Sequence, residues 1–159
     1  MKLKKAKKYS EEIKKILLPI SDKIEVVGSI SRNHPEVKDI DIVLSSKPGK
    51  NILTHLKRFS PTGGEKHVVF KYKGVPVNIW DTPKNSFGAT KLHFSKGKDI
   101  LRIKRSAKDI DLKLTRYGLY KDDKYITGND KVILKLLQPN IDRERFVQEG
   151  QYPRETANY

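Results

Sequence analysis

The chain has 159 residues, which is enough for one domain or two very small ones. Its 34 lysines and arginines outnumber 19 acidic residues and give a formal net charge of +15, spread along the whole chain. Such a charge favours a polyanionic partner, nucleic acid first, over a basic surface that is merely solvated. Cysteine is absent, which excludes disulfides and thiolate metal sites and is typical of a reducing compartment. No run of 18 apolar residues and no apolar segment behind the N-terminal lysines is present, so we expect no membrane span, no signal peptide and an intracellular location.

The first half of the chain alternates helical and strand patterns. A helix is predicted over residues 2–18, because Ile13 and Leu17 belong to an apolar stripe at three- and four-residue spacing and Pro19 ends the pattern. Short apolar runs between turn residues predict strands. The predicted strands are 23–30, 39–45, 66–72 and 75–80, with a further helix at about 50–59. This order indicates an α+β palm, a mixed sheet with helices on one face.

After Pro83 the chain becomes more basic and mainly helical, so we place a boundary there, between subdomains 1–83 and 84–159. A helix is predicted at 98–109 because its apolar residues keep helical spacing. The remaining predictions are a short hairpin formed by 112–119 and 124–126, a helix at 130–137, and a polar tail from Pro139 in which Ile141 and Phe146 could pack back.

Two carboxylates stand at the start of the second predicted strand. Asp39 and Asp41 are two residues apart, so a strand projects both from one face while Ile40, Ile42 and Leu44 face a core. Two neighbouring carboxylates repel each other unless a cation neutralises them, and hard oxygen ligands favour Mg²⁺. The alternative is an exposed strand face with no ligand. The pair therefore predicts a candidate magnesium site.

A Gly28-Ser29 pair lies ten residues upstream of the acidic pair, after an apolar run. Glycine at a strand end exposes backbone N–H groups, and serine adds a hydroxyl, so this turn could hold a phosphate. Arg32 follows three residues later and offers a cation for the same phosphates. Carboxylates for metal ions together with a phosphate-binding turn indicate metal-assisted nucleotidyl transfer.

These residues resemble the motifs of family X DNA polymerases, the group that contains DNA polymerase beta. The first block, Gly-Ser-x-x-Arg followed by Asp-x-Asp, is met by Gly28, Ser29, Arg32, Asp39 and Asp41. Three further blocks occur in the family's order: Gly74–Asn78 with Ser86–Ala89, His93-Phe94-Ser95, and Arg105–Ala107 with Leu114–Leu119. The resemblance covers about residues 10–145 and implies a minimal polymerase in which the amino-terminal lyase domain is absent.

The resemblance implies an activity and a set of site residues. It implies a monomeric, template-directed DNA polymerase that adds dNTPs to a primer 3′-hydroxyl, as in the filling of short gaps during DNA repair. Two Mg²⁺ ions, or Mn²⁺ in their place, would be held by Asp39, Asp41 and position 78. The nucleotide would contact Gly28, Ser29, Arg32, His93, Phe94 and Ser95, and DNA would contact Lys98, Arg102, Lys104, Arg105 and Arg116.

The chain departs from the family pattern at two places. The third catalytic aspartate falls on Asn78, whose amide can offer an oxygen to Mg²⁺ but brings no negative charge and takes no proton. We therefore expect a slow chemical step with nucleotide and DNA binding retained. Asp81 is not a substitute, because three residues along a strand it points to the opposite face. In the sugar-contacting motif, Lys96 stands where the family has glycine.

Two other functions stay open at this point. The chain could be a nucleotidyltransferase whose acceptor is RNA or a protein side chain, although the carboxy-terminal blocks argue against a protein. It could also be a nucleic-acid-binding module that has lost catalysis at Asn78.

Overall fold

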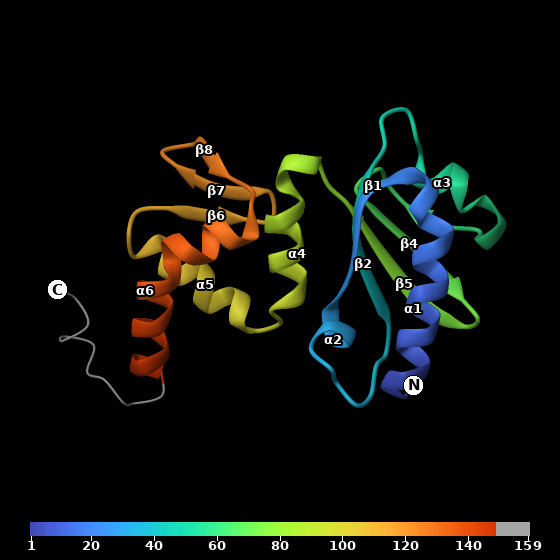
Figure 1. The fold of residues 1–159 in the computed structure, drawn as a ribbon, viewed down its shortest axis with the longest axis horizontal. Helices are drawn as coiled ribbons and strands as arrows, with labels where there is room; N and C mark the ends of the chain where they lie inside the picture. The colour runs from blue at the N-terminus through green and yellow to red at the C-terminus, as the bar shows by residue number, and fades with distance from the viewer. Residues whose placement is uncertain (149–159) are drawn as a thin grey trace.

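The computed structural model describes residues 1–148, of which the side chains at 140 and 142–148 are left out. Two sheets form the molecule: one of five strands in the order β1-β2-β5-β4-β3, and one of three strands in the order β6-β7-β8. Figure 1 shows the larger sheet between helices α1 and α4, with the smaller sheet and α5 and α6 on the far side of α4. The fold is therefore α+β, as the sequence predicts.

The elements follow the chain in a simple order. In the first part they are α1 (Leu3–Leu17), β1 (Ser21–Val27), α2 (Gly28–Ser31), β2 (Ile40–Ser46), α3 (Ile52–His55), β3 (Thr62–Gly63), β4 (His67–Tyr72) and β5 (Val75–Asp81). In the second part they are α4 (Phe87–Ser95), α5 (Asp99–Lys108), β6 (Lys113–Thr115), β7 (Gly118–Lys121), β8 (Lys124–Thr127) and α6 (Asp130–Gln148). Short 3₁₀ turns lie at Leu18–Ile20, Lys57–Phe59 and Lys84–Ser86.

Strand β2 is an inner strand of the larger sheet, next to the central strand β5, and is buried on both faces. It pairs antiparallel with β1 and parallel with β5, so both of its edges are hydrogen-bonded. Ile40, Ile42 and Leu44 point into the core that includes the apolar stripe of α1. Val43 points to the other face, where it packs with Phe87 of α4. Residues of odd number on β2, Asp41 among them, therefore face α4.

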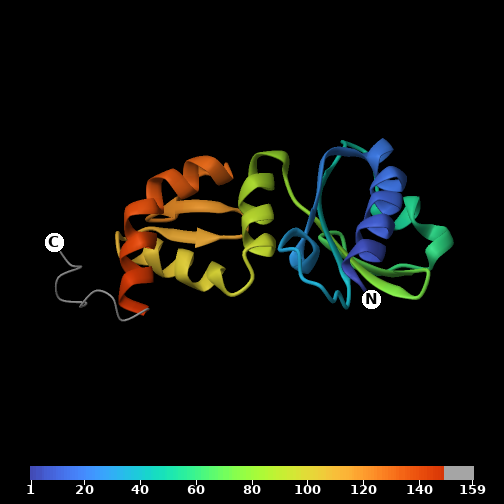
Figure 2. The same cartoon turned by 60° about the horizontal axis from the view of Figure 1, so that its bottom comes forward.

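Helix α4 connects the two parts of the molecule. Its Phe87 packs against the larger sheet, while Ala89 and Leu92 belong to a separate core with α5, α6 and the smaller sheet. The Thr90 hydroxyl donates to the carbonyl of Arg116 at 2.6 Å and lies 2.8 Å from Thr82 Oγ1, whose hydroxyl can donate to it, which fixes the helix to both sides. Figure 2 shows α4 standing between the two sheets.

Several predicted boundaries are wrong, each for a local reason. The strand predicted over 23–30 ends at Val27, because Gly28 turns to a φ of +72° and begins α2. The helix predicted over 50–59 is reduced to one turn of α-helix and a 3₁₀ turn. The strand predicted over 112–119 is broken by a turn at residues 116–117, which gives three strands where a hairpin was expected.

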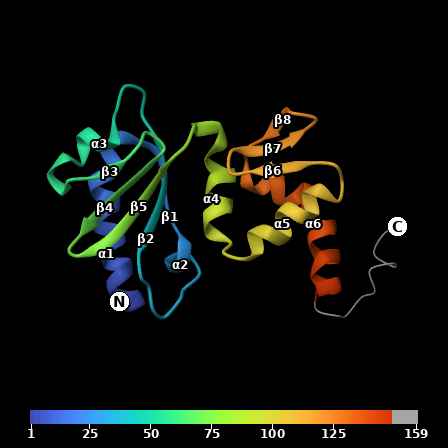
Figure 3. The ribbon, with the colours of Figure 1, turned by 180° about the vertical axis from the view of Figure 1, so that it is seen from behind.

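The predicted pairing of β4 with β5 is confirmed, whereas the predicted end of the last helix at 137 is wrong. Strands β4 and β5 pair through a turn at Lys73-Gly74, where both residues have positive φ angles of 49° and 82°. The polar tail predicted from Pro139 is helical up to Gln148, since α6 continues through the proline, and Ile141 packs against the smaller core. Phe146 lies outside the described side chains. Figure 3 shows α6 and α5 covering the smaller sheet from behind.

The helices of residues 1–148 include none that is both long enough and apolar enough to cross a bilayer.

Candidate active site

The parallel pairing of β2 with β5 brings two of the predicted site residues side by side. Asp41 and Asn78 are partners in the register of these strands. Asp39 lies one residue before β2 begins, close enough that its charge acts on Asp41. The three side chains are half-buried and lie on the face of the sheet that α4 covers in part. The structure thus gathers the two carboxylates and the amide that the sequence singled out.

A tight turn at Gly28 closes one side of this group. A Cβ atom built on Gly28 would overlap the Oδ2 atom of Asp41 and lie 3.1 Å from its Cγ. The φ of +72° at Gly28 is also one that side chains with a Cβ rarely adopt. Glycine is required here for two reasons, and the result is that the start of α2 lies directly against the carboxylate.

The carboxyl group of Asp41 is poorly stabilised in its charged form. Burial and the neighbouring charge of Asp39 raise its pKa to about 6, although a hydrogen bond from the Asn78 amide and the charges of Arg32 and His67 oppose the shift. A carboxylate that is half-buried beside another carboxylate favours a bound cation or a proton. This is the electrostatic arrangement expected of a metal-ligand pair before the ion binds.

His67, which the sequence did not single out, completes the group. It begins β4, opposite Trp80 on β5, and its Nε2 atom lies 3.0 Å from Asn78 Oδ1. Its ring stacks on Trp80 at 3.7 Å between centroids, and Trp80 stacks on Phe94 of α4 at 4.3 Å. No motif marks His67, because its role depends on β4 pairing with β5. The three rings form a continuous stack from the sheet to α4.

The predicted nucleotide-binding residues divide into two groups. Arg32 reaches from the end of α2 to the end of α4, where its Nη1 donates to the carbonyl of Ser95 at 3.5 Å. Ser29 lies on α2 next to Gly28, the residue whose backbone approaches Asp41. Phe94 is instead engaged in the ring stack. His93 packs edge-on against Phe94, and burial, with Lys104 and Arg116 nearby, lowers its pKa.

The predicted DNA-binding residues do not share a single face. Lys98 caps the start of α5, and Arg102 and Arg105 follow it at spacings of four and three, which places the three on one side of the helix. Lys104 lies on another side, close enough to His93 to lower its pKa. Arg116 lies in the turn between β6 and β7, with its guanidinium over the rings of Trp80 and Tyr117 at 6.0 and 5.1 Å.

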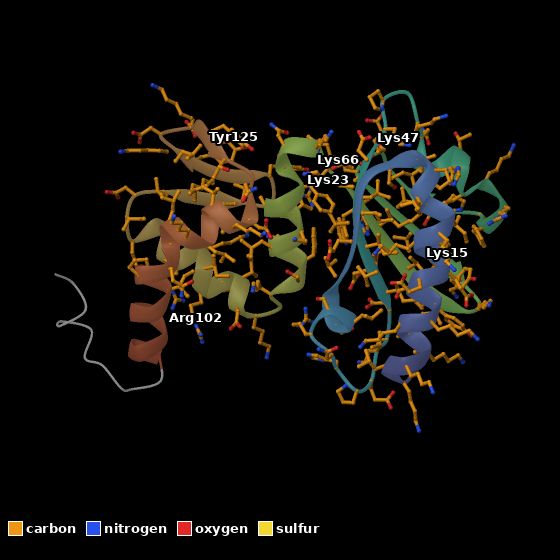
Figure 4. The ribbon with its side chains drawn as sticks, in the orientation of Figure 1. Lys15, Lys23, Lys47, Lys66, Arg102 and Tyr125 are labelled. Atoms are coloured by element: carbon orange, nitrogen blue, oxygen red, sulfur yellow. The ribbon has the colours of Figure 1, made fainter. Side chains whose placement is uncertain are left out.

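A cavity of about 610 Å³ opens at the other end of the larger sheet, away from the carboxylates. Its walls come from both parts of the molecule and include Lys66, Lys84, Tyr117, Tyr120 and Tyr125. Figure 4 shows Lys66 on the side of the larger sheet and Tyr125 on β8 across from it. Asp81 also lines this cavity and is bound to Ser46 Oγ at 2.8 Å, so it points away from Asp41 as the sequence predicts.

The donor atoms beside Gly28 suit a hard divalent cation. Asp39 and Asp41 offer carboxylate oxygens and Asn78 carries an amide oxygen, and burial, with the charge of Asp39, raises the pKa of Asp41 in a way that a bound cation would offset. Among the residues that the structure describes, no three His, Cys, Asp or Glu side chains gather around one point, so the third donor is Asn78 rather than a charged group. The residues present fit Mg²⁺ with less negative charge than three carboxylates would give.

The comparisons with known proteins agree with this architecture. No protein-family model matches the sequence, and no curated protein matches it. Among solved structures, the chain is similar to polymerase beta of Leishmania infantum in a ternary P/T complex, with a TM-score of 0.72 and 14% identity over 87% of this chain and 73% of that chain. It is similar to the same polymerase in a ternary gap complex, with a TM-score of 0.73 and 14% identity over 87% and 67% of the two chains. The protein therefore has a polymerase-beta-like nucleotidyltransferase fold.

Proposed function

We propose that this protein is a family X-type DNA polymerase that adds dNTPs to a primer 3′-hydroxyl by a two-metal mechanism. The observation that carries the proposal is the register of β2 and β5, which sets Asp41 beside Asn78 with the Gly28 turn against the carboxylate. This arrangement lies in a fold similar to polymerase beta. The proposed role is the filling of short gaps, by a monomer with a palm at 1–83 and a nucleic-acid-binding subdomain at 84–159.

Each residue group has a defined part in the proposed reaction. Asp39, Asp41 and the Asn78 oxygen would hold two Mg²⁺ ions, which when bound activate the 3′-hydroxyl and neutralise the triphosphate. The α2 turn lies against Asp41 at Gly28, and Ser29 and the backbone N–H groups of this turn would donate to the phosphate oxygens. Arg32 would stabilise the leaving pyrophosphate from its position between α2 and Ser95. Asn78 accepts no proton, so the 3′-hydroxyl proton would leave to water.

The basic and aromatic surfaces support DNA as the partner. Lys98, Arg102 and Arg105 on α5 would contact phosphates of the duplex. The cavity between the two parts combines lysines with tyrosine rings, a combination that suits a nucleic-acid backbone and its bases. With a net charge of +15, binding would weaken steeply as salt rises.

Primer extension on a duplex with a one-nucleotide gap tests the proposal. The chain and its Asn78→Asp variant are compared with Mg²⁺ and each dNTP in turn. We expect the variant to insert the templated nucleotide at least 100-fold faster, since general-base and charge contributions each reach about this size. Asn78→Ala serves as the control that removes the oxygen donor entirely. Absence of templated insertion by all three proteins, with DNA bound, would contradict the proposal.

Asn78 itself favours a second candidate, a nucleic-acid-binding module without catalysis. Its neutral amide replaces the residue that would complete the metal charge, while the basic surfaces are kept. This candidate predicts gap-specific DNA binding that is indifferent to Mg²⁺ and dNTP. The polymerase predicts tighter binding when the complementary dNTP and Mg²⁺ are present, so a binding titration with and without them separates the two.

A further inference from the structure

The hydrogen-bond partners of Asn78 define which way its amide points. The amide donates to the carboxylate of Asp41, and a carboxylate can only accept. The Nδ2 atom of Asn78 therefore faces Asp41, and Oδ1 faces His67 Nε2 at 3.0 Å. Because Oδ1 also only accepts, the Nε2 atom of His67 carries the hydrogen in this state. The ring then belongs to the Nε2–H tautomer when it is neutral.

This orientation is the wrong one for a metal ligand. A cation in front of Asp39 and Asp41 would meet the N–H groups of the Asn78 amide and not its oxygen. To offer Oδ1 to the cation, the amide must turn over, which sends Nδ2 to His67. His67 can accept that bond only if its Nε2 atom gives up its hydrogen while Nδ1 gains one.

The ring of His67 is held in place while this happens. It lies nearly parallel to Trp80, with an angle of 6° between the planes and centroids 3.7 Å apart. Trp80 is covered on its other side by Phe94 at 4.3 Å. The stack keeps Nε2 aimed at position 78, so a change of tautomer satisfies the turned amide without displacing the imidazole. Histidine is the side chain whose neutral ring presents either a donor or an acceptor at one atom.

We propose that His67 is a positioning residue whose change of tautomer turns the Asn78 amide, so that its oxygen faces the metal site when a divalent cation binds. In this way a neutral residue at position 78 can serve as the third oxygen ligand. The inference rests on the proposed function, because it requires a cation beside Asp39 and Asp41. It assigns to His67 a role that the sequence motifs do not contain, and it explains why an imidazole starts β4 opposite Trp80.

Nitrogen NMR of the ¹⁵N-histidine-labelled protein tests this directly, with Mg²⁺ alone as the probe. The spectra are recorded at pH 8, and the His67→Gln variant identifies the His67 signals by their loss. Without Mg²⁺ we expect Nε2 to be the protonated nitrogen. On addition of Mg²⁺ we expect the hydrogen to leave Nε2 of His67 and the Nδ1 atom to become the protonated nitrogen, so that the two nitrogen chemical shifts are interchanged. The carboxyl ¹³C signals of Asp39 and Asp41 report cation binding independently in the same titration.

The Asn78→Asp variant is the matched control. Its new carboxylate accepts hydrogen bonds at both oxygens, so His67 keeps its Nε2–H with or without Mg²⁺. An exchange in the original chain together with none in this variant supports the proposal. Mg²⁺ binding that moves the carboxyl signals while His67 keeps its tautomer, or becomes doubly protonated, overturns it. Carboxyl signals that stay fixed overturn both this inference and the metal-dependent function.

Two substitutions of His67 separate positioning from packing. His67→Phe keeps a ring to stack on Trp80 but removes the hydrogen bond, and we expect Mg²⁺ to bind about 10- to 100-fold more weakly, as for other outer partners of metal ligands. His67→Gln can donate or accept through its own amide, so we expect it to recover most of that affinity. Equal Mg²⁺ affinity in His67→Phe and the original chain, measured by calorimetry, contradicts the proposed role.

Discussion

The turn at Gly28 gives the sharpest test of the site geometry. In Gly28→Ala the new methyl group overlaps Asp41 Oδ2 and also strains a backbone at a φ of +72°. Gly49 is a matched control, since its φ is +76° and a Cβ there meets nothing within 4 Å. The two variants share the backbone strain and the effect of alanine on the unfolded chain, so their difference isolates the contact with Asp41.

The expected loss of stability in Gly28→Ala is the sum of the backbone strain and the overlap with Asp41. An L side chain in the left-handed region costs roughly 1–2 kcal/mol, which applies equally to both variants. Relieving the overlap at Gly28 adds about 1 kcal/mol, the lower end for an overpacked site, because the Asp41 side chain can rotate away. The rotated carboxylate is then misplaced, and a shift of about 1 Å in a reacting group reduces the rate about 100-fold. Relative to Gly49→Ala, the barrier to reaction should therefore rise by about 2.7 kcal/mol while the free energy of unfolding falls by only about 1 kcal/mol.

Two assays measure these effects separately. Urea unfolding gives the free energy of unfolding of each variant, and we expect Gly28→Ala to lie about 1 kcal/mol below Gly49→Ala with the same m value. Primer extension in the Asn78→Asp background should fall about 100-fold for Gly28→Ala and stay unchanged for Gly49→Ala. Equal stability and equal extension rates for the two variants would refute the close approach of Gly28 to Asp41.

Three further predictions concern charge and packing. The pKa of Asp41 is about 6 in the folded protein, above its ordinary value of about 4, so between these pH values the folded protein keeps a proton that the unfolded chain loses. Without divalent cations, the free energy of unfolding therefore falls as pH rises from about 4 to about 6. Asp41→Asn should remove this fall and abolish stabilisation by Mg²⁺ in urea unfolding at pH 5 and 8. Phe94→Ala should cost about 2 kcal/mol, less than for a fully buried ring, and shift the emission of Trp80 to longer wavelength as that ring gains solvent. In a filter-binding titration, Lys98→Ala should reduce the slope of log affinity for DNA against log salt concentration by about one. Lys15→Ala, on α1 at the opposite face of the larger sheet, should leave this slope unchanged.

Much of the candidate site could be predicted from local sequence. The alternation around Asp39 and Asp41 places both carboxylates on one face, and the core side of β2 is as predicted. The same alternation correctly predicts that the Asp81 side chain points away from Asp41; it accepts a hydrogen bond from Ser46. These predictions hold because a strand's side-chain period is a property of the backbone itself, independent of which strands it pairs with.

Other features depend on contacts between distant segments. The need for glycine at position 28 is only partly local, because a Cβ there would also overlap Asp41, which β2 brings to this turn. The turn at residues 116–117 was missed because no glycine or proline marks those two positions. The stacking of Phe94 on Trp80 was not predicted, because only the placement of α4 against the sheet brings the two rings together.

The sequence by itself identified the candidate donor set, namely Asp39, Asp41 and Asn78, and the glycine turn before them, because residue type and spacing are local. The tertiary structure decided that β5 pairs parallel to β2 and that β4 pairs with β5, which sets Asn78 between Asp41 and His67. The order of strands in a sheet is chosen by the burial of whole faces, Ile42 and Val43 on the two sides of β2 among them. The burial of whole faces depends on residues far apart in the chain, so no single local motif predicts the strand order.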